Sequence, residues 1–316
     1  MTPLPNNKIV VVCGPTASGK TALGVALAHA LNGEVVSADS MQIYRGMDIG
    51  TAKPTAEEMQ GVPHHMIDVA DPGEDYSVAR YVEEASACVD RLLALGKTPI
   101  LVGGTGLYLD SLILGRRFAP FPGKIRAELT RRLQNEGISS LYETLKTVDP
   151  ERAARLHQKD EKRIIRALEV YYETGRTLTE HDRESQSLPP RYEAATIFLN
   201  YADRADLWQR IDRRVDEMER AGLVEEVQRL LRSGVSPHTT AMQAIGYKEF
   251  SAALRGEESL EAALDQVKLR SRQYAKRQVT WFRRNEQALR YEWKKIPDLA
   301  DALQASTAFV REHGIG

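Results

Sequence analysis

One stretch of the sequence decides the fold class: Gly14-Pro15-Thr16-Ala17-Ser18-Gly19-Lys20-Thr21. It fits the phosphate-binding pattern G-x-x-x-x-G-K-[ST] at every required position. The β-branched run 9–13 before it predicts a buried parallel strand, and the helical spacing of 21–31 after it predicts a helix that ends before Gly33. Such a turn presents backbone N–H groups to phosphate oxygens, while Lys20 adds a charge and the Thr21 hydroxyl can reach Mg²⁺. The chain is expected to bind a phosphorylated ligand.

The composition is that of a folded globular protein. The chain has 316 residues, of which 42% are hydrophobic and 28% charged. It contains no run of about 20 apolar residues that could span a membrane, and residues 1–8 lack an apolar signal region. Its two cysteines, Cys13 and Cys88, are too few for a disulfide framework or a four-ligand zinc site. We therefore expect a cytoplasmic protein without membrane attachment.

Strand and helix patterns alternate in the first third of the chain. Strands are predicted at 9–13, 34–38 and 98–102, with a helix over 77–95. This alternation predicts an α/β fold with a parallel sheet. Short, charged helical segments follow, and an apolar strand at 194–199 then returns. We predict a P-loop α/β core of residues 1–115 plus 191–316, flanked by helices, with a helical insertion at 116–190.

Two polar segments should meet at the carboxyl edge of this sheet, where ligands gather. Asp39 follows the strand at 34–38 and is equally suited to bind Mg²⁺ through water, to accept a proton or to cap a turn. Thr105 lies between Gly104 and Gly106, where its hydroxyl would be exposed. The same pattern is equally typical of a tight turn in which the threonine has no role. The strand at 98–102 ends in glycines rather than in the acidic residue of nucleotide-hydrolysing relatives, which weakens an ATPase interpretation.

Other charged residues are less informative. A predicted helix at 204–221 carries Arg210, Arg213, Arg214 and Arg220, any of which could complete a pyrophosphate clamp. The adjacent pair His64-His65 is weak evidence for a metal site, because neighbouring side chains do not point the same way.

The net charge of −1 gives the whole chain no attraction for nucleic acid, but the basic residues are clustered. Residues 268–284 contain seven basic residues and no acidic one, and residues 116–176 contain 14 Lys and Arg against 9 Asp and Glu. In the predicted C-terminal helix, Tyr274, Gln278 and Trp281 would face the core and leave outward cations without counter-charge. That arrangement suits a polyphosphate backbone.

Together these segments resemble the tRNA dimethylallyltransferase family over almost the whole length. Beside the P-loop, the resemblance rests on four blocks that follow in chain order: residues 39–54, 63–68, 103–108 and 243–249, and on the segment 272–283. The blocks at 39–54 and 272–283 are close to diagnostic. The chain lacks the C-terminal Cys/His zinc finger of eukaryotic relatives, so it resembles the bacterial form.

The resemblance implies a specific reaction. A dimethylallyl group passes from dimethylallyl diphosphate to N6 of the adenosine 3′-adjacent to the anticodon, position 37, in tRNAs that read codons beginning with U. Asp39 is implied as general base and Thr105 as its neighbour. Lys20, Thr21 and Arg214, with Mg²⁺, are implied to stabilise the departing diphosphate. The resemblance also implies a monomer that contacts the anticodon stem-loop through Asp39, Ser40, Met41, Gln42, Lys162, Arg163, Ile164, Ile165, Arg166, Ala167, Gly246, Tyr247, Lys248, Arg272, Lys276, Arg277 and Gln278.

Three alternatives stay open at this point. A small-molecule kinase explains residues 1–110 but not the basic segments. A prenyltransferase acting on free adenine nucleotides explains the chemistry equally well. A non-catalytic RNA-binding ATPase gives no reason for Asp39 and Thr105 beside the loop.

Overall fold

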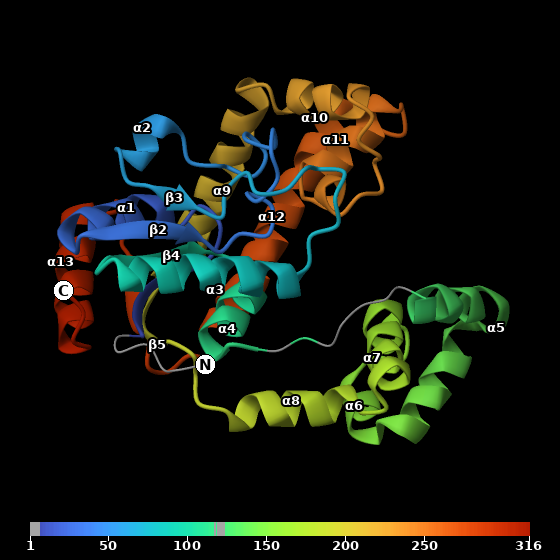
Figure 1. Cartoon of the computed structure of the whole chain (residues 1–316). Helices are drawn as coiled ribbons and strands as arrows, with labels where there is room; N and C mark the ends of the chain where they lie inside the picture. The colour runs from blue at the N-terminus through green and yellow to red at the C-terminus, as the bar shows by residue number, and fades with distance from the viewer. Residues whose placement is uncertain (1–6, 117, 119–123) are drawn as a thin grey trace. The chain divides into compact units, whose positions relative to one another are not determined.

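The computed structural model describes residues 7–116, 118 and 124–316. The chain divides into two compact units, one formed by residues 1–113 with 191–316 and the other by residues 114–190 (Figure 1).

The first unit is built on a parallel sheet. Its described residues form six strands in the order β3-β2-β4-β1-β5-β6, every neighbouring pair of which is parallel. The strands are β1 (Lys8–Cys13), β2 (Gly33–Ser37), β3 (His64–His65), β4 (Thr98–Gly103), β5 (Glu193–Tyr201) and β6 (Leu289–Trp293). Val12 pairs with Val102 of β4 and Ile197 of β5. The carboxyl ends of the central strands therefore finish side by side.

Helices link and cover the strands of this unit. The connection from β1 to β2 passes over β4 through α1, and α3 returns the chain from β3 to β4. Right-handed crossovers running in these opposite directions place α1 and α3 on opposite faces. The helices are α1 (Lys20–Ala30), α2 (Ala56–Met59), α3 (Val78–Ala94), α4 (Gly106–Leu114), α9 (Arg204–Arg220), α10 (Leu223–Arg232), η1 (Ala241–Gln243), α11 (Tyr247–Leu254), α12 (Leu260–Phe282) and α13 (Leu299–Glu312).

The core of the first unit lies between the sheet and these helices. Strands β1 and β4 are buried along almost their whole length, as their continuous apolar runs require. Val10 and Val12 pack with Leu23 and Leu27 of α1 and with Ile211 of α9 in one apolar cluster. This packing fixes the strand ends, and with them the loops that carry the site.

The second unit is helical. It contains α5 (Lys124–Val148), α6 (Pro150–Arg155), α7 (Glu161–Thr174) and α8 (Leu178–Ser187). Gly137 interrupts α5 with non-helical dihedrals, and Asp149 and Asp160 cap α6 and α7. Leu129, Leu141, Leu145, Ile164 and Leu168 form its small core.

The predicted α/β fold is confirmed. The strand at 98–102 is β4, and the helix predicted at 77–95 is α3, whose N-terminus Ser77 caps. Among the elements that the sequence did not predict are the two-residue β3, the edge strand β6 and the terminal helix α13. None of the described helices is long and apolar enough to cross a membrane.

Candidate functional site

The P-loop joins β1 to α1, and its last two residues begin the helix. Gly19 precedes α1 in a left-handed conformation, and no side chain caps the helix end. Within the described residues, nothing accepts a hydrogen bond from the backbone amides of Ala17 and Gly19. Free amides at a helix N-terminus attract anions. The loop therefore has the geometry of the anion-binding turn that its sequence predicts.

Two distant residues hold the P-loop in place. Gln278 of α12 accepts a hydrogen bond from Thr16 N at 2.9 Å through Oε1, and its Nε2 donates to Gly104 O at 2.9 Å. Trp293 Nε1 donates to Ser18 O at 2.7 Å. A Cβ at Gly104 would lie 2.2 Å from Gln278 Nε2, so only glycine leaves room for this bridge. Gln278, expected to contact tRNA, has its amide fully engaged within the protein.

Asp39 follows β2 and is fixed by the turn it begins. Its Oδ1 accepts hydrogen bonds from Met41 N at 2.8 Å and Gln42 N at 3.3 Å. Its Oδ2 has no hydrogen-bond partner in the described part of the chain. Capping and proton acceptance, which the sequence left as alternatives, are thus compatible: one oxygen holds the turn and the other is available.

Thr105 contacts the turn that Asp39 begins, and the Asp39 charge acts on Tyr274 of α12. Thr105 N donates to Ala38 O at 3.2 Å, and its hydroxyl accepts from Ser40 N at 3.1 Å and bonds Ser40 Oγ at 3.3 Å. Burial, reinforced by the Asp39 charge, raises the pKa of Tyr274 to about 12. Tyr274, which the sequence assigned to the core, is half-buried.

Cations gather around the P-loop. Lys20 Nζ donates to Pro15 O at 2.7 Å, and burial together with the Arg214 charge lowers the Lys20 pKa to about 8, against an opposing effect of Asp39. Burial also lowers the pKa of Arg214, which has no hydrogen bond or ion pair with any described residue. Arg210 Nε donates to Ala17 O at 3.3 Å. Desolvated cations without a carboxylate partner favour the binding of an anion.

The structure distinguishes among Arg210, Arg213, Arg214 and Arg220 of α9, which the sequence could not. Arg213 pairs with Glu217 at 3.8 Å, and Arg220 Nε donates to Asp216 O at 3.1 Å. Arg210 contacts the P-loop through Ala17 O, and the charge of Arg214 acts on Lys20.

The residues around the P-loop fit a metal ion that a phosphate ligand shares. No cluster of three or more His, Cys, Asp or Glu side chains that could hold a metal exists among the described residues. Magnesium in phosphate sites takes only one or two protein ligands, and the remainder come from phosphate and water. The Thr21 hydroxyl makes no hydrogen bond to a described residue, and the Ser18 hydroxyl is buried without a partner. His65 Nε2 instead bonds Glu34 Oε2 at 2.7 Å.

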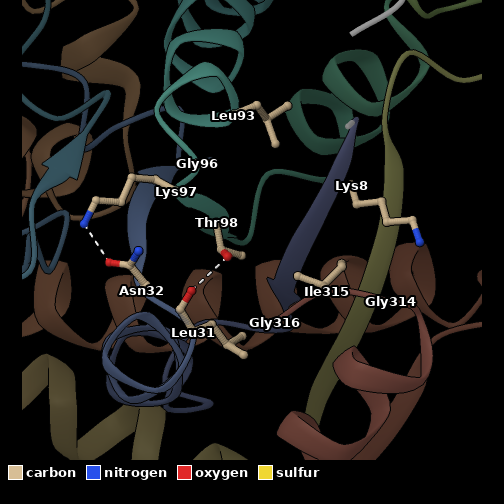
Figure 2. A pocket seen from close by; sticks show the side chains of 10 residues that line it. All are labelled: Lys8, Leu31, Asn32, Leu93, Gly96, Lys97, Thr98, Gly314, Ile315 and Gly316. Carbon is tan, nitrogen blue, oxygen red and sulfur yellow. Dashed lines mark hydrogen bonds between the residues drawn. The ribbon is translucent and has the colours of Figure 1, made fainter. Parts of the chain in front are cut away.

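A pocket of about 310 Å³ lies at the other end of the sheet, lined by Lys8, Lys97 and the chain end at 314–316 (Figure 2). Its polar atoms bond one another: Lys97 Nζ donates to Asn32 Oδ1 at 2.8 Å, and Thr98 Oγ1 to Leu31 O at 2.9 Å. It is remote from the loops that follow the strands, and we assign it no part in the chemistry.

The basic face of α12 differs from the sequence expectation. Three of its cations have counter-charges: Lys268 pairs with Asp216 at 2.5 Å, Arg270 with Glu249 at 3.0 Å and Arg272 with Asp212 at 2.6 Å. The expectation of an unpaired row is therefore wrong for these three, because α9 and α11 supply acidic side chains that the local sequence does not contain. Lys276, Arg277, Arg283 and Arg284 are exposed and make no ion pair within the described chain.

Helix α7 of the second unit carries the other predicted RNA contacts. Lys162 and Arg163 are exposed, and Arg163 pairs with Asp160 at 3.0 Å. Ile164 and Ala167 are 0% and 1% exposed in the core of that unit, so their predicted contact with RNA, which stays a prediction, would not be made by their side chains. Ile165 is half-buried, and Arg166 bonds the buried Glu169 at 3.0 Å.

The segment 246–248 divides in the same way. Lys248 is exposed, whereas Gly246 is buried and Tyr247 is 0% exposed, with its hydroxyl 2.5 Å from Glu226 Oε1. The predicted RNA contact of Tyr247 stays a prediction, and its hydroxyl is engaged within the protein. Gln42 is also engaged internally, since Oε1 accepts from Ser37 Oγ at 3.1 Å and Nε2 donates to Ala52 O at 3.1 Å. Ser40 and Met41 lie half-buried beside Asp39.

Sequence reasoning missed Glu226. Its signal was present, because it falls on the same helical face as the apolar Leu223, Val227 and Leu230. A carboxylate on a buried face needs partners, and this one finds them in a loop that is distant in sequence.

Comparison with known proteins gives consistent results. The IPP transferase family model matches residues 42–285, and the Isopentenyl transferase model matches residues 7–73. The chain is 50% identical to a tRNA dimethylallyltransferase of Desulforudis audaxviator, covering 96% of each chain. It is also 50% identical to one from Caldanaerobacter subterraneus, covering 87% of this chain and 89% of the other.

Solved structures agree. A full-length tRNA isopentenylpyrophosphate transferase from Bacillus halodurans is 39% identical, with a TM-score of 0.72 over 97% of this chain and 98% of the other. A eukaryotic dimethylallyltransferase acting on tRNA is 32% identical, with a TM-score of 0.81 over 96% of this chain and 78% of the other.

Proposed function

The chain belongs to the tRNA dimethylallyltransferase family, and on that premise we propose how its site transfers a dimethylallyl group to tRNA. The donor is dimethylallyl diphosphate. The acceptor is the exocyclic N6 of the adenosine 3′-adjacent to the anticodon, position 37, in tRNAs that read codons beginning with U. The products are the modified tRNA and free diphosphate.

One observation carries this proposal: among the described residues a carboxylate oxygen without a partner follows β2, at the same edge of the sheet as the P-loop, and the cations Lys20 and Arg214 have no carboxylate partner. The Asp39 charge opposes the lowering of the Lys20 and Arg214 pKa values. A cradle for a leaving anion next to a proton acceptor is what substitution by a neutral amine requires.

The steps follow from this arrangement. The N6 lone pair of adenosine attacks C1 of the dimethylallyl group, and the C1–O bond breaks, so that its electron pair leaves with the diphosphate. The proton on N6 passes to Asp39 Oδ2. An aromatic amine is a weak nucleophile, so stabilisation of the leaving group and alignment of the reactants supply most of the rate enhancement.

The P-loop and its neighbours hold the leaving group. The free amides of Ala17 and Gly19, the Lys20 ammonium and the Arg214 guanidinium supply positive charge where negative charge develops. The Thr21 hydroxyl would hold a Mg²⁺ ion, which would add positive charge beside the diphosphate oxygens. Thr105 orients the turn that carries Asp39.

The exposed cations serve the RNA. We assign phosphate contacts to Lys276, Arg277 and Lys248 in the first unit and to Lys162 and Arg163 in the second. Adenosine N6 within a stacked loop cannot meet both the base and the donor, so the nucleotide must leave its stack at a cost of a few kcal/mol. We further propose that the enzyme is a monomer. We place it in the cytoplasm, where its tRNA substrate occurs.

A comparison of three acceptors, each supplied separately, tests this function. Purified protein is supplied with dimethylallyl diphosphate and one of three acceptors: tRNA that lacks the prenyl modification, AMP or ATP. We expect consumption of the donor with tRNA only. Consumption with AMP or ATP, and none with tRNA, would support the free-nucleotide prenyltransferase instead.

A further inference from the structure

The buried carboxylate of Glu226 on α10 accepts hydrogen bonds from three backbone amides of one loop. Its side chain is 1% exposed. Oε2 accepts from the backbone amides of Asp48 and Ile49, each at 3.0 Å, and Oε1 accepts from Ile49 N and Gly50 N, each at 3.2 Å. Three consecutive amides directed at one anion form a nest, which ordinarily binds a free anion. Here the anion belongs to the protein.

Tyr247 of α11 also contacts the Glu226 carboxylate. Its hydroxyl donates to Glu226 Oε1 at 2.5 Å, and burial together with the Glu226 charge raises the Tyr247 pKa, so the hydroxyl keeps its proton. A Cβ at Gly50 would lie 2.5 Å from Tyr247 Cε2, so the loop touches the ring directly. The nearest cation, Arg229, is 3.7 Å away and 63% exposed. The Glu226 charge is therefore compensated mainly by the loop amides and Tyr247.

The clamped loop leads back to the candidate base. Thr51 and Ala52, the next residues, accept hydrogen bonds from Gln42 Nε2 at 3.3 and 3.1 Å. The backbone amide of Gln42 in turn donates to Asp39 Oδ1. An unbroken series of contacts thus joins Glu226 to the carboxylate proposed to accept the N6 proton.

We propose that Glu226, assisted by Tyr247, is a positioning residue that holds the loop 48–52 and through Gln42 sets the orientation of Asp39. The inference rests on the proposed function, because it concerns the geometry of that reaction. Glu226 itself touches no reacting atom. Displacement of a catalytic group by about 1 Å can reduce a rate about 100-fold, so loosening this contact should slow transfer without removing a ligand.

The test compares Glu226→Gln with Glu225→Gln. The two substitutions change charge equally on the same helix, but Glu225 is exposed. Glutamine fills the same volume as glutamate but places an NH₂ group among donating amides, where it cannot accept. Tyr247→Phe is a milder second variant, which keeps the ring and loses one hydrogen bond. The measurements are the single-turnover rate at saturating tRNA and donor, and donor affinity without RNA.

We expect Glu226→Gln to lower the single-turnover rate about 10–100-fold and Tyr247→Phe about 2–5-fold, with donor affinity within about twofold of wild type. Glu225→Gln should match wild type. A wild-type rate in Glu226→Gln, or an equal loss of donor affinity, overturns the inference; if Glu226→Gln does not fold, Tyr247→Phe decides on the same terms. Absence of transfer to tRNA by the wild-type enzyme would instead contradict the proposed function.

Discussion

The P-loop end of the sheet and the outer face of α12 both carry positive charge, but in different states. Lys20 and Arg214 are half-buried, lack carboxylate partners and have lowered pKa values. Lys276 and Arg277 are exposed to water. A desolvated cation interacts strongly with one compact anion at a fixed place, whereas an exposed cation interacts weakly and is screened by salt. The first arrangement suits a diphosphate and the second an RNA backbone.

Asp39 is the proposed proton acceptor, and its substitution should have the largest effect. Asparagine can still accept the turn hydrogen bonds through its amide oxygen but cannot accept a proton. We expect Asp39→Asn to lower the single-turnover rate of prenyl transfer about 10²–10⁴-fold while tRNA affinity changes little. Rapid-quench transfer beside filter binding measures both. A rate near that of wild type would mean that Asp39 only caps its turn.

Removal of the half-buried Lys20 ammonium should weaken the interaction with the donor and leave tRNA binding unchanged. We expect Lys20→Ala to weaken dimethylallyl diphosphate binding or slow transfer by about 10–100-fold, because a charge-assisted contact contributes about 1.5–3 kcal/mol. tRNA affinity should stay within about twofold of wild type. Calorimetry for the donor and filter binding for tRNA separate the two effects. An equal loss of tRNA affinity would show that the loop grips the RNA backbone.

The lowered pKa of Lys20 predicts a pH effect of known sign. In the protein without donor, the Lys20 pKa is about 8. A bound diphosphate favours the charged form of Lys20 and so raises that pKa. Donor binding should therefore take up a proton above pH 8, and affinity should fall by up to about tenfold per pH unit as pH rises from 8. A Lys20→Arg variant stays charged and should lose this dependence. Donor affinity that is flat from pH 7 to 9.5 would contradict the assignment.

The exposed cations should give the smallest effect, visible in the salt dependence. Each neutralised phosphate contact reduces the slope of log affinity against log salt by about 0.7–0.9. Lys276→Ala with Arg277→Ala should therefore flatten the slope for tRNA by about 1.4–1.8. Arg270→Ala with Arg272→Ala is a matched control on the same helix, whose cations are already paired with Glu249 and Asp212. An equal change in both double variants would show that the ion pairs open on binding.

The parts of the site that depend on local sequence or on strand order could be predicted. The P-loop is local, so its pattern alone places Lys20 and Thr21 at a helix start. Asp39 and Thr105 could be brought together because parallel strands end at one edge. These inferences needed only the order of strands and loops.

What could not be predicted depends on contacts between distant segments. Gln278 reaches Thr16, Trp293 reaches Ser18 and Glu226 reaches Asp48, and no local pattern indicates such pairs. The pairing of Arg272 with Asp212 likewise requires the packing of α12 on α9. The burial of Ile164 and Ala167 was within reach, because their spacing with Leu168 is that of an apolar helix face.

The most direct test of this division of charge is donor affinity measured without RNA in three proteins. These are wild type, Lys20→Ala and the double variant Lys276→Ala with Arg277→Ala. The account predicts that dimethylallyl diphosphate binds the double variant within about twofold of wild type and binds Lys20→Ala about tenfold or more weakly. Weaker donor binding by the double variant, or unchanged binding by Lys20→Ala, would contradict the claim that the two regions serve two different substrates.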